Sequence, residues 1–276
     1  MLCLMQWTDF TRQILFAGLL FALVTAGAPA QAQPSWDGTL RRVHVPILMY
    51  HYVGVLPEDA DDVRRDLTVQ PDVFEGHLRY LVEQGYSTIT LYQLYDALML
   101  GAPLPPNPIV LTFDDGYIDH YATVFPLLQQ YGLTGTFFVI TGRADANDPA
   151  YVNWVQINEM AQAGMSMEPH TKSHMSLHER DRDFLVYEML GSKQSLQAHT
   201  GMDVRMFAYP AGRYDDETLR IATEVDFQLA VTTQPGMQHV TSGLLELPRV
   251  RVSGNTSVSG FAYLLRGDWL VQIKRG

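Results

Sequence analysis

The sequence predicts an α/β fold, a distorted (β/α) barrel of seven or eight strands in a single domain. Short apolar runs alternate with helical patterns along the chain, which is the order of elements in βα-repeating domains. Glycines follow several of the helical patterns, where a left-handed C-cap is expected. Polar or ionisable residues directly follow four of the apolar runs, as they do at the mouth of a parallel barrel.

The expected strands are short apolar runs with room for a helix between them. They cover residues 45–50, 109–113, 135–140, 165–168, 206–209, 227–231 and 247–252. Helical patterns, several of them preceded by Asp, Thr or Asn caps, cover residues 71–84, 91–100, 118–131, 153–163, 181–199 and 216–224. The proline-rich segment 103–108 is too poor in backbone donors for a helix or a central strand, so we expect a rigid connector there.

The first 32 residues have the pattern of a secretory signal peptide. An apolar run at 14–25 follows Arg12 and is followed by the A-x-A cleavage pattern at 30–32. The alternative is an uncleaved membrane anchor, although this run is shorter than the ~20 apolar residues needed to span a bilayer. We therefore expect an exported protein, periplasmic, associated with the cell envelope or secreted, with one domain at 33–276.

The composition excludes several classes of protein. Hydrophobic residues make up 47% and charged residues 18% of the 276 residues, which argues against intrinsic disorder. The net charge of −11 argues against a nucleic-acid partner, whose phosphates require a basic face. The single cysteine, Cys3, lies in the predicted leader, so the mature chain has neither a disulfide nor a thiolate nucleophile.

Two adjacent carboxylates, Asp114 and Asp115, follow the apolar run at 109–113 and precede Gly116. Neighbouring positions at a strand end point in different directions, so one carboxylate can bind a metal ion while the other acts as a general base. The alternative is an ordinary Asp-Gly turn with a helix cap.

Two histidines, His170 and His174, lie four residues apart after the run at 165–168. At that spacing both imidazoles can face a single ion, and two His with one carboxylate form a common open catalytic site. The alternative is a pair of surface histidines on a loop. Apart from His51, which is discussed below, we expect the remaining histidines to be structural or solvent-facing. They are His44, His77, His120, His178, His199 and His239.

A third segment, residues 207–214, runs from a strand into a tight turn that contains Tyr209-Pro210-Ala211-Gly212. Such a turn can aim backbone N–H groups at one point, as stabilisation of a tetrahedral oxyanion requires. Pro and Gly are also common in turns that have no catalytic role.

Together the three segments resemble the polysaccharide deacetylase family, the NodB-homology carbohydrate esterases of family four. Segments 112–116, 170–174 and 209–212 resemble its first, second (H-[S/T]-x-x-H) and third motifs, and the resemblance extends over about residues 45–252. It implies hydrolysis of an N-acetyl group from an amino sugar. The roles implied are a divalent metal bound by Asp115, His170 and His174, and Asp114 as general base. We further expect the backbone N–H of Ala211 to stabilise the oxyanion, and Tyr209 and Pro210 to contact the substrate.

The chain departs from the family pattern near its C-terminus, where the Leu-x-His segment with the usual acid is replaced by the sequence at 247–252. The segment 49–53, Met-Tyr-His-Tyr-Val, is similar to the subgroup of poly-N-acetylglucosamine deacetylases, in which the motifs are permuted. Our hypothesis is that His51 supplies the acid; the alternative is a buried structural histidine. Arg251 is a candidate partner of Asp114 that would keep it ionised, as an arginine often does for this base in the family, and the alternative is a surface arginine on the last strand.

We therefore expect a secreted metal-dependent deacetylase of poly-N-acetylglucosamine-like or chitin-like polymers. Zinc suits a site of two His and one Asp, and Co²⁺, Ni²⁺ or Mn²⁺ would also be accepted. The expected partner is an N-acetylated polysaccharide, with no nucleic acid and no membrane span after cleavage of the leader. Two alternatives stay open: a metal-dependent hydrolase of non-sugar amides or esters, and a glycan-binding module without activity. Tyr117 and Trp154 are candidate sugar-stacking faces or core residues.

Overall fold

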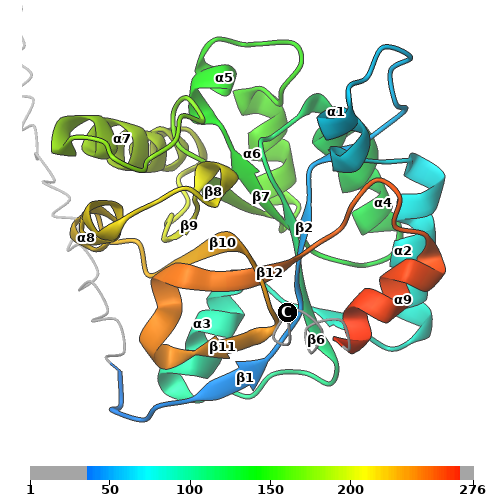
Figure 1. The fold of residues 1–276 in the computed structure, drawn as a ribbon, viewed down its shortest axis with the longest axis horizontal. Coiled ribbons are helices and arrows are strands. Elements are labelled where there is room, and N and C mark those ends of the chain that lie inside the picture. Colours follow the sequence, from blue (N-terminus) through cyan, green and yellow to red (C-terminus); the bar gives the residue numbers. More distant parts are fainter. Residues whose placement is uncertain (1–35, 268–276) are drawn as a thin grey trace, which may run out of the picture. The chain divides into compact units, whose positions relative to one another are not determined.

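Seven parallel strands form a nearly closed barrel in the computed structural model, which describes residues 36–267 (Figure 1). The predicted leader and Cys3 lie outside the described residues. In spatial order the strands are β8 (Ser166–Pro169), β7 (Thr136–Val139), β6 (Pro108–Phe113), β2 (Ile47–Tyr50), β12 (Leu247–Arg251), β10 (Leu229–Pro235) and β9 (Met206–Ala208). The predicted fold class is confirmed, and each of these strands overlaps an expected run.

Five very short strands within residues 36–267 were not expected from the sequence. They are β1 (Arg42–His44), β3 (Tyr52–Val53), β4 (Thr68–Val69), β5 (Ser87–Thr88) and β11 (Gln238–Val240). β1 pairs with β11, β3 with β4, and β5 extends the main sheet beside β6. Strands of two or three residues are too short to show an alternating pattern.

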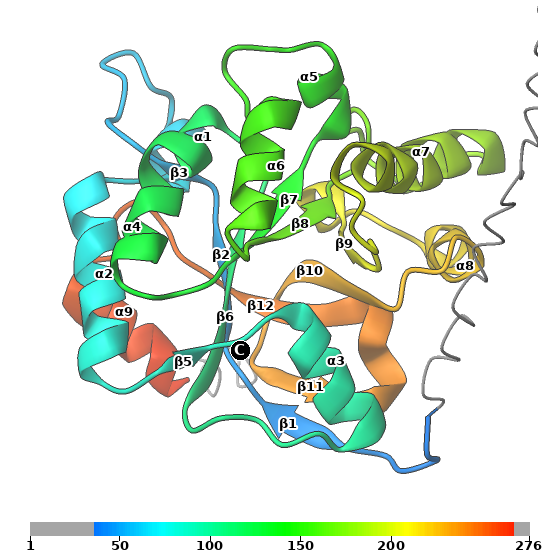
Figure 2. The same cartoon turned by 180° about the vertical axis from the view of Figure 1, so that it is seen from behind.

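Within residues 36–267 the predicted helices are present, together with three further α-helices and two 3₁₀ turns. The observed elements are α1 (Asp62–Leu67), α2 (Pro71–Glu83), α3 (Leu91–Leu100), η1 (His120–Val124), α4 (Phe125–Gln130), α5 (Thr141–Asp145), α6 (Trp154–Gln162), α7 (Arg182–Thr200), η2 (Pro210–Gly212), α8 (Asp216–Glu224), η3 (Thr241–Glu246) and α9 (Val258–Arg266). In both views α2, α4 and α9 lie together on one side of the barrel (Figures 1 and 2). In the part of the chain at 36–267, no helix combines the length and apolar character that crossing a membrane requires.

The helix expected at 118–131 is divided into a π-helical turn, η1, and the α-helix α4. Pro126 stands in the first turn of α4 and has no N–H to continue a regular ladder from the preceding turn. The N–H of Phe125 therefore bonds to the carbonyl of His120, five residues earlier.

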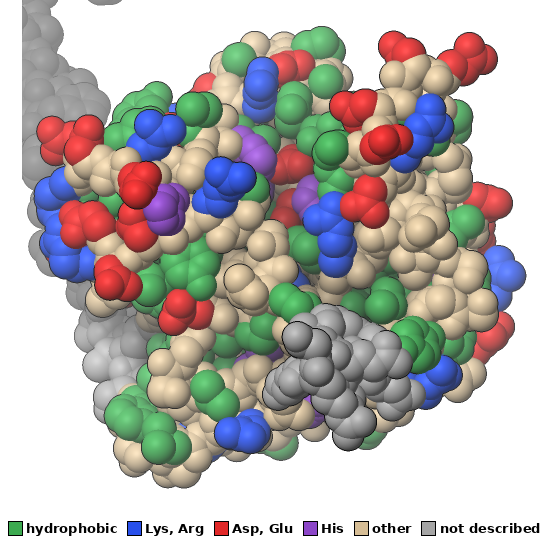
Figure 3. All heavy atoms as spheres, viewed as in Figure 1, with side chains coloured by type: hydrophobic (Ala, Val, Ile, Leu, Met, Phe, Trp, Pro, Cys, Tyr) green, Lys and Arg blue, Asp and Glu red, His purple; other side chains and the backbone are tan. Residues whose placement is uncertain are grey.

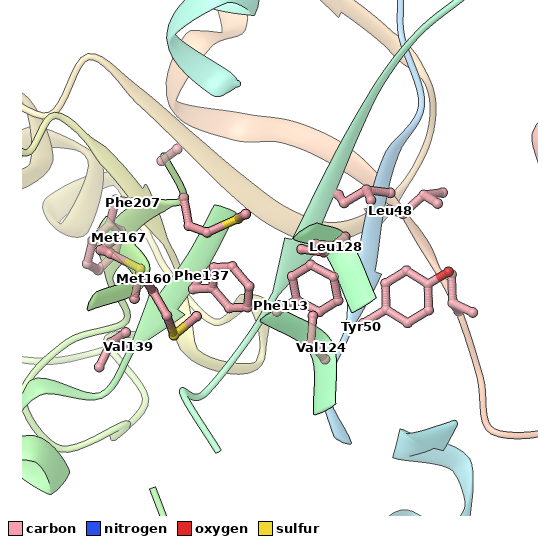
Figure 4. Close-up of a cluster of buried hydrophobic side chains, with 14 of the residues drawn as sticks. Leu48, Tyr50, Phe113, Val124, Leu128, Phe137, Val139, Met160, Met167 and Phe207 are labelled. Carbon is pink, nitrogen blue, oxygen red and sulfur yellow. The ribbon is translucent and has the colours of Figure 1, made fainter. Parts of the chain in front are cut away.

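The core forms two layers, because successive side chains of a strand point to opposite faces. One layer lies between the strands and the helices, and Figure 4 shows part of it. There the rings of Tyr50, Phe113 and Phe137 stack in a row across β2, β6 and β7, with centroids 5.4 and 4.8 Å apart. The other layer takes alternate strand positions such as Val110 and includes Leu94 from α3.

Hydrogen bonds from side chains connect β8 and β9, the first and last strands of the barrel sheet. The Met206 N–H donates to Glu168 Oε2 over 3.1 Å, and His170 Nδ1 lies 2.8 Å from the carbonyl of Ala208. Glu168 is fully buried, and this burial raises its pKa to about 8. Glu168 on β8 and His170 directly after it therefore close the gap between β8 and β9.

Candidate active site

Ionisable side chains gather at the carboxyl ends of the barrel strands, as the sequence predicted. Asp114 and Asp115 follow β6, His170 follows β8, and His51 follows β2. Figure 3 shows histidine and carboxylate side chains together in a hollow near the middle of this face. Parallel strands bring these separate stretches of sequence to one mouth.

Asp115, His170 and His174 converge on a single point. The Nε2 atoms of His170 and His174 lie 3.5 and 3.1 Å from Asp115 Oδ1, and one ligand atom from each residue lies within 4.8 Å of the others. Asp115 Oδ1 is buried and has no hydrogen bond of good geometry within residues 36–267. This donor set fits a divalent metal ion with room for water and substrate.

The backbone at Asp115 separates the two neighbouring carboxylates. Asp115 has φ +78°, a left-handed conformation that Asp tolerates better than most residues. Its side chain faces the two imidazoles, whereas Asp114 faces an arginine. The adjacent carboxylates are therefore available for different tasks, as the sequence suggested.

His170 is held in the orientation that a metal ligand requires. The Ala208 carbonyl can only accept, so Nδ1 of His170 carries the hydrogen and Nε2 keeps its lone pair. Burial lowers the pKa of His170 to about 4, and the imidazole is neutral near pH 7. His174 differs: burial lowers its pKa, but contact with Asp115 outweighs that and the pKa is raised.

Asp114 forms a two-pronged ion pair with Arg249 of β12. Arg249 Nη1 and Nη2 donate to Asp114 Oδ1 and Oδ2, each over 2.7 Å. Arg249 also donates to Thr112 Oγ1 and to the Thr232 carbonyl, and it is only 1% exposed. Burial alone would raise the pKa of Asp114, but Arg249 outweighs it, so the pKa is lowered and the carboxylate stays ionised.

The expected pairing of Arg251 with Asp114 is wrong. Arg251 extends instead to Asp66, in an ion pair whose side chains are 44% and 46% exposed. Arg249, two residues earlier on β12, forms the pair with Asp114 that was predicted for Arg251. The alternative considered there, a surface arginine on the last strand, describes Arg251.

His51 lies beside the carboxylate of Asp114. Its Nε2 is 4.0 Å from Asp114 Oδ2, and its side chain is 14% exposed. Burial lowers the pKa of His51, while Asp114 and Asp115 oppose this change. His120 Nε2 lies 2.6 Å from the carbonyl oxygen of His51, so a buried histidine supports the backbone that presents His51 to the mouth.

The third motif contributes differently from what the sequence suggested. Tyr209 has no exposed surface, and its ring packs against Phe207 and Tyr214 with centroids 5.3 and 4.5 Å away. Pro210 is buried as well. Their side chains therefore offer no surface to a sugar, which corrects the expected substrate contacts. Ala211 is exposed and has φ +51° on the turn η2.

The two candidate stacking residues have other aromatic partners. The ring of Tyr117 stacks on Tyr52 at 3.6 Å and meets Tyr151 at 5.2 Å. Trp154 stacks on His199 at 3.9 Å and donates from Nε1 to an oxygen of Asp145. Both rings are half-buried, which favours the core alternative for their stacked faces.

Comparison with known proteins agrees with this geometry. A family model described as polysaccharide deacetylase matches residues 101–230. A Bacillus subtilis protein named "Putative polysaccharide deacetylase YxkH" is 35% identical over 233 residues, covering 83% of this chain and 79% of the relative. The chain belongs to the polysaccharide deacetylase family.

Solved structures of deacetylases share the fold. Streptococcus pyogenes deacetylase PplD, determined in complex with acetate, superposes with a TM-score of 0.75 at 33% identity, covering 82% of this chain and 99% of that one.

The Escherichia coli poly-β-1,6-N-acetyl-D-glucosamine N-deacetylase is a more distant relative by sequence, 23% identical, covering 74% of this chain and 36% of the relative. This chain thus spans about a third of that relative's length. An N-acetylated polysaccharide is the substrate class that membership of the deacetylase family implies.

Proposed function

We propose that this polysaccharide deacetylase is a metal-dependent hydrolase of N-acetyl groups on amino-sugar polymers of the poly-N-acetylglucosamine or chitin type. The observation that carries the proposal is an ionised, arginine-paired Asp114 next to the convergent ligands Asp115, His170 and His174. Relatives named for poly-β-1,6-N-acetyl-D-glucosamine support the substrate class. Zinc is the ion that this ligand set suits best.

The residues of the mouth divide the work of amide hydrolysis between them. A divalent ion held by the triad supplies Lewis acidity and lowers the pKa of water. Asp114, kept ionised by Arg249, takes the proton of the attacking water as general base. His51, on the side of Asp114 Oδ2, protonates the leaving amine, and the N–H of Ala211 stabilises the oxyanion.

Removal of the metal is expected to abolish acetate release. We expect chelator-treated protein to lose nearly all activity on a chitooligosaccharide or a β-1,6-linked N-acetylglucosamine oligomer, and added Zn²⁺ to restore it, because the carbonyl would no longer be polarised. Released acetate is the measurement, with mock-treated protein as the control. Equal rates before and after chelation would rule out the metal-dependent mechanism.

Substrate comparison separates this proposal from its rivals. Acetate release from simple esters or cyclic amides but not from the sugar oligomers would favour a non-sugar hydrolase on the same scaffold. Binding of polymer without release of acetate would favour a glycan-binding module.

Removal of the His51 imidazole is expected to change the pH dependence of turnover. A general acid must be protonated, so activity falls as the pH rises through its pKa and the rate profile has a basic limb. In His51→Ala we expect turnover to fall by about 10²-fold and this limb to disappear. A variant with near-normal turnover and an unchanged basic limb would assign His51 a structural role.

We also propose that residues 1–32 are a cleaved leader and that the domain at 33–276 acts outside the cytoplasm. The A-x-A pattern at 30–32 and the apolar run at 14–25 support this. The N-terminal sequence of the protein recovered from its native host tests it; a protein that retains residues 1–32 would favour an anchor.

A further inference from the structure

The loop that joins the two histidine ligands has an unfavourable backbone conformation. Thr171 and His174 have φ values of +66° and +61°, in the left-handed region that residues with a Cβ rarely adopt. The His174 N–H donates to Thr171 Oγ1 over 2.9 Å, which closes the loop on itself. Such a conformation persists only where surrounding groups hold it.

The start of α5 holds one side of this loop. The N–H groups of Thr141 and Gly142 donate to the carbonyls of Thr171 and Lys172 over 3.1 and 2.9 Å. A Cβ added at Gly142 would lie 2.3 Å from the Lys172 oxygen, closer than any non-bonded approach allows. The two backbones therefore meet as closely as glycine permits.

The carboxylate of Glu188, on α7, holds the other side. Its Oε2 accepts the backbone N–H groups of Lys172 and Ser173, each over 2.9 Å, and its Oε1 accepts the Ser173 hydroxyl. Glu188 is 1% exposed, and no ion pair joins it to a cationic side chain within residues 36–267. Among the described residues, the side-chain oxygens of this buried carboxylate take their hydrogen bonds from the loop, and these donors stabilise it in place of a cation.

The two histidines depend on this loop to different degrees. His170 is anchored by its own contact with the Ala208 carbonyl across the barrel gap. His174 has a side chain that is 37% exposed, and the turn at 171–173 sets its direction. Anything that loosens the turn will therefore displace His174 more than His170.

We propose that Glu188 is a positioning residue for the metal site: through the N–H groups of Lys172 and Ser173 it holds the loop in the shape that brings His174 to Asp115. This inference rests on the proposed metal-dependent function. It adds a buried residue from α7 whose carboxylate bonds to the loop between the two histidines, and it assigns the role to hydrogen bonding by the carboxylate rather than to its charge.

Three variants of α7 separate these roles. Glu188→Ala removes every acceptor, and we expect its Zn²⁺ affinity, measured by competition with a chromophoric chelator, to fall about 10- to 100-fold. Glu188→Gln keeps an amide oxygen for the two backbone donors, and the Ser173 hydroxyl can turn to accept, so we expect an affinity close to that of the wild type. Asp183→Asn, an exposed position on the same helix, makes the same charge change as Glu188→Gln and is the matched control.

Amide hydrogen exchange of the metal-free protein provides a readout that does not need the ion. Exchange at Lys172 and Ser173 should be faster in Glu188→Ala than in the wild type, and close to wild type in Glu188→Gln. Unchanged exchange and unchanged Zn²⁺ affinity in Glu188→Ala would overturn the proposal, and so would a Gln variant as weak as the Ala variant, since charge would then be the cause.

Two further results keep the test decisive. If Glu188→Ala does not fold, Ser173→Ala removes only the hydroxyl contact and should weaken Zn²⁺ binding and speed loop exchange to a smaller extent; no change in either would count against the proposal. If the wild-type protein binds no Zn²⁺, the proposed metal-dependent function fails, whereas the exchange measurement still decides whether Glu188 holds the loop.

Discussion

Arg249→Met is expected to lower the free energy of unfolding by about 3–5 kcal/mol, because it leaves the Asp114 carboxylate buried without its cation. Arg249 supplies two charged donors to Asp114 and is itself 1% exposed, so its removal leaves a carboxylate that is only 2% exposed without a counter-charge. Urea denaturation near pH 7 measures the effect. A loss below about 1 kcal/mol, typical of an exposed pair, would show that this buried pair stabilises the fold no more than a surface pair does.

Two controls identify the unpaired charge as the cause. Arg251→Met breaks the ion pair with Asp66, whose partners are nearly half exposed, and should cost no more than about 1 kcal/mol. The double variant Arg249→Met with Asp114→Leu removes both buried charges and should be more stable than Arg249→Met alone. A double variant as unstable as the single one would point to lost packing of the arginine stem instead.

The sequence was sufficient to predict the barrel and most of its mouth. Buried parallel strands are continuous apolar runs, and β6 and β8 end directly before Asp114-Asp115 and His170. Strand direction alone then brings residues more than fifty positions apart to one place. The short strands and α1, which buries no residue, leave no periodic pattern and were not expected.

The length of an arginine side chain explains the error at Arg251. On β12, Arg251 pairs in register with Met49, which in turn pairs with Thr112. A strand rises about 3.3 Å per residue, so Arg249 begins about 6.6 Å deeper. Its side chain extends past Thr112 to reach Asp114, whereas Arg251 starts higher and extends beyond the mouth. The position of Arg251 at the end of a strand therefore indicated that its Cα atom lies near the mouth, but it did not indicate where its guanidinium group lies.

Glu188 had no signal in the sequence at all. It is one acidic residue in the middle of a long helical pattern, where a solvated face is the ordinary expectation. Its role arises from the packing of α7 against the loop that follows β8, a tertiary contact that local patterns do not encode. The same applies to the Ala208 carbonyl that orients His170.

Asp114→Asn is expected to lower turnover by about 10²- to 10⁴-fold while leaving the metal ligands in place. An amide cannot take a proton from water, and no hydrogen bond or ion pair joins Arg249 to Asp115, His170 or His174 within residues 36–267. Steady-state acetate release and Zn²⁺ content of the purified variant are the two measurements. Asp115→Asn is the paired variant and should lose Zn²⁺ as well as activity.

The comparison of these two neighbours decides the division of labour at the mouth. Both carboxylate oxygens of Asp114 accept hydrogen bonds from Arg249, and one of them lies 4.0 Å from His51 Nε2. Asp115 instead faces the imidazoles of His170 and His174. If Asp114→Asn lost Zn²⁺ and Asp115→Asn kept it, the ligand and the base would have to be exchanged. If Asp114→Asn kept both its Zn²⁺ and wild-type turnover, the base would lie elsewhere, because the carboxamide of an asparagine cannot accept a proton from water as a carboxylate does.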